Sequence, residues 1–141
     1  MSMLTHTDNI KVGHGYVEAL SKGDMATVGR LLADDVVWHQ PGTSHLSGTY
    51  RGKKNVFQHL GKFTELSNNS FRVDQVGIVM ANGNLVTAKL HFVAKRPGRT
   101  LSMDGVDLMR IEAGQIKEMW LFSNDQAAED AFWTLDIEQS A

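Results

Sequence analysis

Residues 85–95 read LVTAKLHFVAK and residues 100–111 read TLSMDGVDLMRI, and these two stretches decide the fold. Both are rich in β-branched and large apolar residues, as strands are. Pro97-Gly98 lies between them and favours a turn. We therefore expect two antiparallel strands. In the first strand the apolar set faces a core: Val86, Ala88, Leu90 and Phe92. This parity places His91 on the opposite face.

The neighbouring segments extend this sheet on both sides. Asn82-Gly83 is a hairpin signal that links a strand starting near Ser70 to the strand at 85–95. Ala113-Gly114 predicts a further turn before a last strand at 115–123. The result is a meander of four hairpin-linked strands.

The N-terminal part has helical periodicity instead. The elements that we expect are a helix at 8–22 with Asp8 as N-cap, a second from Asp24 to Leu32, a third at 53–66 ended by Asn68-Asn69, a short strand at 36–39, and a closing helix capped by Asn124 or Asp125. Gly13 and Gly15 are unfavourable inside a helix, which indicates either a close helix–sheet approach or a pocket opening.

Helices followed by a strand meander define an α+β fold. We expect a single domain over residues 1–141 with a core at about 8–135. Three N-terminal helices cover a curved antiparallel sheet, a short C-terminal helix closes the chain, and an apolar pocket lies between the layers.

Composition excludes several classes of protein. The net charge of the 141 residues is -2 and basic residues form no stripe, which argues against nucleic-acid binding. There is no cysteine, so disulfides and thiolate chemistry are excluded, and a reducing cytoplasm suits the chain. We see no signal peptide and no apolar run long enough for a membrane span.

No motif for a metal or cofactor is present. There is no His-Glu-x-x-His, P-loop, Gly-x-Ser-x-Gly or dinucleotide fingerprint in the sequence. We therefore expect neither a cofactor nor a metal.

Four segments resemble a known superfamily: YVEALSKGD (16–24), LLADDVVWHQPG (31–42), LSGTYRG (46–52) and IKEMWLFSND (116–125). The chain resembles the nuclear-transport-factor-2-like superfamily, in its SnoaL-like and ketosteroid-isomerase-like branch. The resemblance implies a cone-shaped α+β fold. It also implies a homodimer through the outer sheet face, where His91, Val93, Leu108 and Leu121 are expected.

Asp107 is the strongest catalytic candidate. It lies between Val106 and Leu108 in a strand, where burial would raise its pKa. A protonated Asp107 could donate a hydrogen bond to an oxyanion, and an ionised one could act as a base. By the resemblance, Asp107 and Tyr16 match the oxyanion-hole pair of ketosteroid isomerase. The alternative is a core tyrosine and a structural buried acid.

The sequence departs from ketosteroid isomerase before Pro41. Gln40 stands where that enzyme has its catalytic aspartate, and an amide does not titrate. His39 could supply a base near neutral pH. Strict strand alternation, however, places His39 on the face opposite to Trp38 and Gln40.

The pocket lining that we expect is Trp38, Gln40, Leu90, Phe92, Met109, Glu118, Trp120 and Phe122. Glu118 could instead sit at the rim and pair with Arg110 or Lys89. The loop histidine His45 could lie at the pocket mouth, whereas His6, His14 and His59 are interpreted as solvated. Asp125 caps the closing helix or pairs with Arg51.

Three functional hypotheses follow. The first is a cofactor-free enzyme, an isomerase or cyclase/lyase that acts on an apolar ring or carbonyl compound by acid/base chemistry. The second is a non-catalytic ligand carrier. The third is an interaction module on the same fold.

Overall fold

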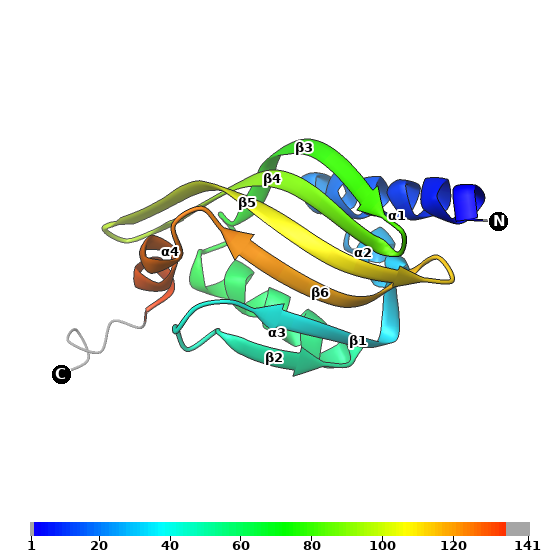
Figure 1. Ribbon diagram of the computed structural model, residues 1–141. Helices are drawn as coiled ribbons and strands as arrows, with labels where there is room; N and C mark the ends of the chain where they lie inside the picture. The colour runs from blue at the N-terminus through cyan, green and yellow to red at the C-terminus, as the bar shows by residue number, and fades with distance from the viewer. Residues whose placement is uncertain (1, 135–141) are drawn as a thin grey trace.

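The computed structural model describes residues 2–134, with side chains from residue 8 onward. The helices are α1 (Ser2–Lys22), α2 (Met25–Leu31), α3 (Lys53–Leu66) and α4 (Gln126–Trp133). The strands are β1 (Leu32–Gln40), β2 (Gly48–Arg51), β3 (Arg72–Asn82), β4 (Leu85–Arg96), β5 (Arg99–Glu112) and β6 (Gln115–Ser123). The expected α+β class is confirmed (Figure 1).

All six strands form one curved sheet in the order β2-β1-β6-β5-β4-β3. The meander from β3 to β6 is antiparallel, as the hairpin signals predicted. The expectation of a wholly antiparallel sheet is wrong at one place, because β1 pairs with β6 in parallel. A parallel pair needs a long crossover, and here the whole chain between the two strands provides it.

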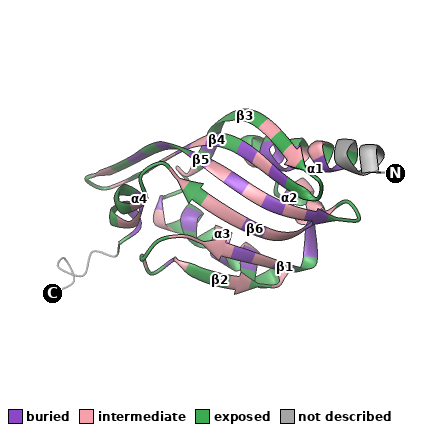
Figure 2. Cartoon of the chain, in the orientation of Figure 1, coloured by how far each residue is buried: buried purple, intermediate pink, exposed green. Residues whose placement is uncertain are grey.

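The sheet has two unlike faces. Helices α1 and α3 lie behind it in the view of Figure 1, and α4 lies at the end of β5 and β6. The inner face, which meets the helices, holds the buried side chains of the central strands, including Val86, Ala88, Leu90, Phe92 and Met109. The outer face carries half-buried and exposed residues (Figure 2). The predicted alternation of β4 is therefore confirmed.

Some predicted boundaries are wrong. Helix α1 begins at Ser2, so Asp8 lies inside it; no glycine or proline precedes Asp8 to stop the helix. Strand β1 is longer than the expected 36–39 because it begins directly after α2. The segment 48–51, for which no strand was predicted, forms β2 by pairing with β1.

The turns follow the sequence signals closely. The hairpin near Asn82 turns on Gly83 and Asn84, one residue later than predicted, since Asn82 already pairs with Leu85. Ala113 and Gly114 turn between β5 and β6 with positive φ angles of 52° and 78°, as a primed two-residue turn requires.

Helix α1 packs very closely against the sheet at Gly13. A Cβ at that position would lie 2.7 Å from Val86 Cγ1 and 3.2 Å from Val79 Cγ1. Of the two readings of Gly13, the close helix–sheet approach is confirmed. This contact fixes where the next turn of α1 meets the sheet, and Tyr16 is on that turn.

Across the described part of the chain, no helix has both the length and the apolar character needed to cross a membrane.

Candidate functional site

A hollow opens between the helices and the inner face of the sheet. It contains about 610 Å³ of space free of atoms, including its open mouth. Helices α1, α3 and α4 and strands β1, β3, β4, β5 and β6 contribute to its wall, which is mainly apolar and aromatic. Its polar members are Tyr16, Gln40, Asp107, Ser123 and Glu129. An apolar wall with few polar groups is typical of small-molecule sites.

Asp107 is buried on the inner face of β5, with 4% of its surface exposed. Its cross-strand neighbours are Ala88 and Leu121, both apolar. No hydrogen bond to its carboxyl forms within the described residues. Burial, with a smaller contribution from the charge of Glu129, raises the pKa of Asp107 from 3.8 to about 7. Both of its protonation states are therefore populated near neutral pH.

Tyr16 is completely buried and lines the same hollow from α1. Its hydroxyl makes no hydrogen bond to any described residue. Burial, and then the nearby charge of Asp107, raise the pKa of Tyr16 well above its usual value. The hydroxyl therefore stays protonated and is free to donate to a bound oxygen. The structure brings together the two residues that the resemblance paired.

Glu129 is a second acid in the hollow, and sequence reasoning missed it. It is 5% exposed on α4 and accepts hydrogen bonds from Ser123 Oγ (2.5 Å), Gln126 Nε2 (3.2 Å) and Trp133 Nε1 (3.3 Å). Burial raises its pKa and these bonds oppose the rise. A glutamate one turn into a short helix carries no sequence signal of burial, since it reads as an ordinary solvent-facing residue.

A polar cluster forms another wall of the hollow, around Gln40. Trp38 Nε1 lies 3.0 Å from Gln40 Oε1, and His59 Nε2 lies 2.9 Å from the same oxygen. The His59 ring stacks on Tyr50 at 3.9 Å between centroids. His59 is 1% exposed, so its interpretation as a solvated residue is wrong. Its spacing from Val56 and Phe63, also buried, is the signal that could have placed it inside.

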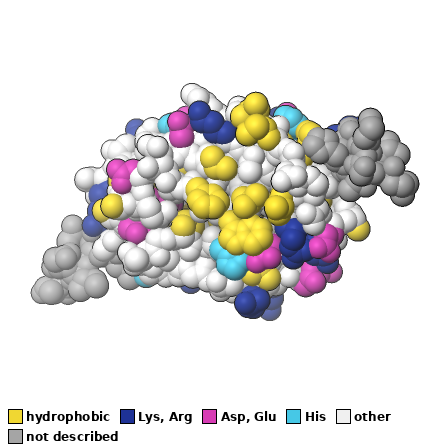
Figure 3. All heavy atoms as spheres, in the orientation of Figure 1, with side chains coloured by type: hydrophobic (Ala, Val, Ile, Leu, Met, Phe, Trp, Pro, Cys, Tyr) yellow, Lys and Arg dark blue, Asp and Glu magenta, His cyan; other side chains and the backbone are white. Residues whose placement is uncertain are grey.

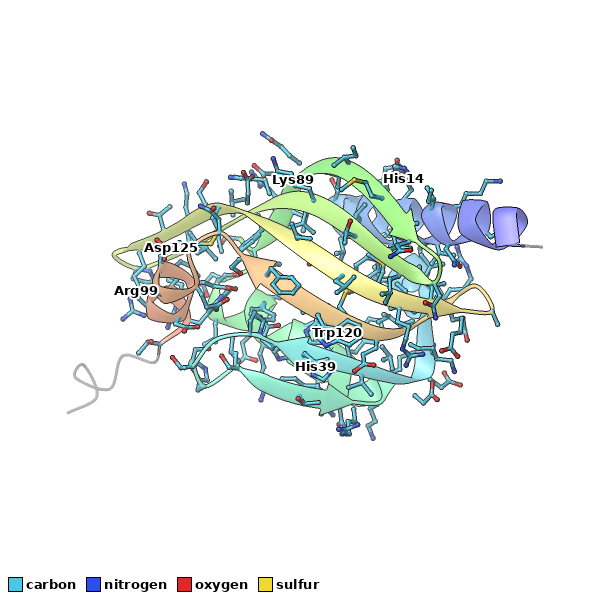
Figure 4. The ribbon with its side chains drawn as sticks, in the orientation of Figure 1. His14, His39, Lys89, Arg99, Trp120 and Asp125 are labelled. Carbon is cyan, nitrogen blue, oxygen red and sulfur yellow. The ribbon has the colours of Figure 1, made fainter. Side chains whose placement is uncertain are left out.

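His39 does not reach the hollow. Its ring stacks on Trp120 at 5.5 Å and 13° on the outer face (Figure 4). His39 Nε2 lies 2.6 Å from Glu118 Oε2. The register shift in β1 lies between Leu32 and Val37, and from Val37 to His39 the pairing with β6 is continuous, so no bulge there turns His39 inward. The catalytic role expected for His39 has no support from this placement.

Trp120 and Glu118 were expected in the pocket wall, and neither lies there. For Glu118 the alternative expectation, pairing with Arg110, is confirmed. Both residues lie on the outer face with His39, where Glu118 also contacts Arg110 at 3.5 Å. The reason is register: Leu121, not Trp120, pairs with Asp107 and shares its face. Leu121 was expected on the outer face and instead lines the hollow.

The remaining lining residues divide into two groups. Leu90 and Phe92 line the hollow as expected. Phe122 also belongs to the wall, although 55% of its surface is exposed. Met109 is fully buried but lies in the core and not in the wall of the hollow.

Other candidate residues have structural contacts. Asp125 caps α4 by accepting a hydrogen bond from the Ala128 amide at 3.0 Å, which confirms one of its two predicted roles. His91 lies on the outer face between Asp74 Oδ1 (2.7 Å) and Ser102 Oγ (3.2 Å), so it links β3, β4 and β5. His14 and His45 are exposed.

The described side chains contain no cluster of three or more potential metal ligands. The chemistry within reach is therefore that of the chain's own groups: a carboxyl that titrates near pH 7, a free phenol hydroxyl and an oriented amide around an apolar space. Together the fold and the hollow define a class of protein, small α+β domains that enclose a ligand between helices and a curved sheet.

A family model confirms and narrows this class. The model described as SnoaL-like domain matches residues 14–119. The chain belongs to the SnoaL-like domain family, as the sequence segments had indicated.

Known relatives agree on the fold. A protein of unknown function with a cystatin-like fold from Xanthomonas campestris has 45% sequence identity and a TM-score of 0.86, over 90% of this chain and 98% of that one. An uncharacterized protein of Mycobacterium tuberculosis is 29% identical over 115 residues, 82% of this chain and 88% of that protein. TerC, co-crystallized with polyporic acid, superposes with a TM-score of 0.76 at 18% identity, over 89% and 97% of the two chains.

Proposed function

We propose that the protein binds a small apolar ring or carbonyl compound in the hollow and exchanges a proton with it through Asp107. The observation that carries this proposal is one carboxyl, with a pKa of about 7, in the same apolar space as a phenol hydroxyl that has no hydrogen-bond partner among the described residues. A general acid or base works best when its pKa lies near the working pH. TerC, a protein of the same fold, was co-crystallized with polyporic acid, which supports a small-molecule ligand.

The proposed step needs only residues of this chain. Ionised Asp107 takes a proton from the carbon next to a ligand carbonyl, and the electron pair of the broken C–H bond moves onto the carbonyl oxygen. The Tyr16 hydroxyl donates a hydrogen bond to the resulting oxyanion. Return of the proton to another position completes an isomerisation. For a cyclisation, the enolate carbon attacks a second carbonyl of the ligand, the electron pair of that C=O bond moves onto its oxygen, and protonated Asp107 returns the proton to the resulting alkoxide.

A ligand carrier is the second candidate. Its support is that Gln40 replaces an acid and that His39 points to the outer face, so the hollow lacks the base that ketosteroid isomerase has at this position. A carrier would bind the same compounds without exchanging their protons.

A thermal-shift screen with steroids, phenolic polyketide-like compounds and terpenoids tests both candidates. A ligand that binds the folded state raises the melting temperature by mass action. We expect a ring compound to stabilise the wild type and Asp107→Asn to change that shift, whereas Asp35→Asn, on the exposed Lys117 contact, leaves it unaltered.

The bound compound is then incubated in D₂O and analysed by mass spectrometry. Exchange next to its carbonyl by the wild type, lost in Asp107→Asn, supports the enzyme. Binding without exchange supports the carrier. If no compound shifts the wild type, the hollow is not a site for apolar ring ligands.

We also propose that the outer face forms a homodimer. A hydrophobic patch lies near the middle of the viewed side of the molecule (Figure 3). Trp120 lies on this outer face (Figure 4), and strand alternation places Phe122, which is 55% exposed, on the same face. A twofold interface buries the same patch from both copies. Light scattering at micromolar concentration should give twice the chain mass, and Trp120→Lys should give the monomer mass. A monomeric wild type contradicts the proposal.

A further inference from the structure

The orientation of the Gln40 side-chain amide can be worked out from its two neighbours. Trp38 Nε1 lies 3.0 Å from one terminal atom of that amide. An indole nitrogen only donates hydrogen bonds. The atom that it meets must therefore accept, so it is the oxygen Oε1. The reverse orientation would place two N–H donors against each other.

This orientation also decides the tautomer of His59. His59 Nε2 lies 2.9 Å from the same Oε1. A carbonyl oxygen can only accept, so the imidazole carries its proton on Nε2 and donates it. Nδ1 is then the bare nitrogen, and it is buried without a partner among the described residues. Burial lowers the pKa of His59 to about 4, so the ring stays neutral near pH 7.

Both lone pairs of Gln40 Oε1 are thus occupied, and the NH₂ end is left over. Gln40 Nε2 makes no hydrogen bond within the described part of the chain, and Gln40 lines the hollow. A polar group held in mainly apolar surroundings is costly unless something accepts from it. Gln40 is half-buried, so water can accept from Nε2 when no ligand is bound, and a ligand that displaces this water must supply the acceptor itself.

The register of the strands relates Gln40 to Asp107. His39 pairs with Trp120 across β1 and β6, so Gln40 is level with Leu121, which pairs with Asp107 across β6 and β5. Gln40 and Asp107 therefore flank Leu121 in one row on the inner face. Ordinary strand spacing places their Cα atoms roughly 9–10 Å apart. A ligand lying over Leu121 would have one polar group at each end.

We propose that Gln40 Nε2 donates a hydrogen bond to an oxygen of the ligand, and that Trp38 and His59 are positioning residues that hold the amide in this orientation. The ligand class is an apolar ring compound with oxygen acceptors at two opposite ends, one for Gln40 and one for Tyr16 and Asp107. A ligand with a cationic amine at the Gln40 end would be rejected, because donor would face donor. This inference rests on the proposed function and specifies the chemistry of its ligand.

Three related probes test it by calorimetry: 6-hydroxy-1-tetralone, with two oxygens, and the single-oxygen compounds 1-tetralone and 5,6,7,8-tetrahydro-2-naphthol. A neutral hydrogen bond contributes about 1 kcal/mol. The wild type should bind the two-oxygen probe roughly 5-fold more tightly than either relative. In Gln40→Met, which keeps the length of the side chain, one relative should bind as tightly as the two-oxygen probe.

The failures are distinguishable. If the wild type binds all three probes equally, the hollow accepts rings and the proposed function stands, but the role of Gln40 is wrong. The same conclusion follows if Gln40→Met keeps the full preference for two oxygens. If no probe binds the wild type, both the inference and the proposed ligand class are contradicted.

The positioning role has an independent readout in nitrogen NMR of the imidazole rings. His59 should carry its proton on Nε2 and show a bare Nδ1 from about pH 6 to about pH 8, because burial keeps it neutral. His59→Phe should reduce the preference for the two-oxygen probe, and His14→Phe, at an exposed histidine of α1, should leave it unaltered. A proton on Nδ1 would mean the opposite amide orientation and overturn the proposal.

Discussion

Leu121 and Trp120 are consecutive residues of β6, and they lie in different chemical environments. Leu121 lines the hollow beside Asp107, whereas Trp120 stacks on His39 on the outer face. Each face also has its own carboxyl group. Asp107 on the inner face lacks a hydrogen-bond partner among the described residues, whereas Glu118 on the outer face contacts His39 at 2.6 Å and Arg110 at 3.5 Å.

The surroundings of a carboxyl group decide how strongly it holds its proton. A carboxylate with cationic or donor partners is stabilised in its ionised form. A carboxylate enclosed by apolar side chains is not, so it holds its proton to higher pH. Strand parity therefore places Asp107 among apolar side chains and Glu118 beside His39 and Arg110.

The largest expected effect is on the pH dependence of stability. The pKa of Asp107 is about 7 in the folded state against 3.8 for an ordinary aspartate. Its contribution to stability is fully present below pH 4 and is lost as the pH rises to about 7, because the unfolded chain releases the proton first. Relative to Asp107→Asn, the wild type should lose on the order of 4 kcal/mol across this window, measured by urea unfolding.

Asp35→Asn is the matched control. Its carboxylate is exposed, and the hydrogen bond from Lys117 Nζ lowers its pKa. A group whose pKa is lowered in the folded state stabilises the protein above its unfolded pKa, and this stabilisation is lost only on acidification. Asp35→Asn should therefore show the same dependence of stability on pH as the wild type between about pH 5 and pH 8. Equal slopes for wild type and Asp107→Asn would mean that Asp107 is solvated.

A smaller effect is expected where α1 approaches the inner face. Gly13→Ala places a methyl group 2.7 Å from the stiff side chain of Val86, so it should destabilise the protein by about 1–3 kcal/mol despite the higher helix propensity of alanine. Gly61→Ala in α3, where nothing lies within 4 Å, should instead stabilise by about 0.5–1 kcal/mol. Thermal unfolding of both variants measures the difference, and an equal gain at both sites would refute the close approach.

The smallest effect concerns the free hydroxyl of Tyr16. Because this buried group has no hydrogen-bond partner within residues 8–134, Tyr16→Phe should leave the stability of the ligand-free protein unchanged or raise it by about 1 kcal/mol. The same variant should weaken binding of carbonyl ligands. A loss of stability in chemical unfolding would indicate that the hydroxyl is already satisfied in the folded protein.

Prediction from the sequence succeeded where a residue pattern allowed only one structural interpretation. In β4 only one parity is apolar, so the inner face was predictable, and the Asp107 position followed from its place between Val106 and Leu108. Asn68 and Asn69, with φ angles of 53° and 66°, end α3 as expected, since asparagine tolerates this conformation.

Prediction failed where both faces of a strand carry large apolar residues, and where pairing between segments far apart in the chain determines the structure. In β6 both sets contain large apolar residues, so only the pairing of Leu121 with Asp107 shows which set faces inward. The parallel partnership of β1 and β6 joins segments far apart in the chain. Glu129 becomes part of the hollow only because α4 folds back onto β5 and β6.

The central claim is that the hollow holds Asp107 with a pKa near neutrality. Carboxyl carbon NMR on protein labelled at aspartate, with Asp107→Asn to assign the signal, measures this pKa directly in the ligand-free state. We expect the Asp107 carboxyl to titrate with a midpoint at about 7. A midpoint near 4, the ordinary value for aspartate, would contradict it.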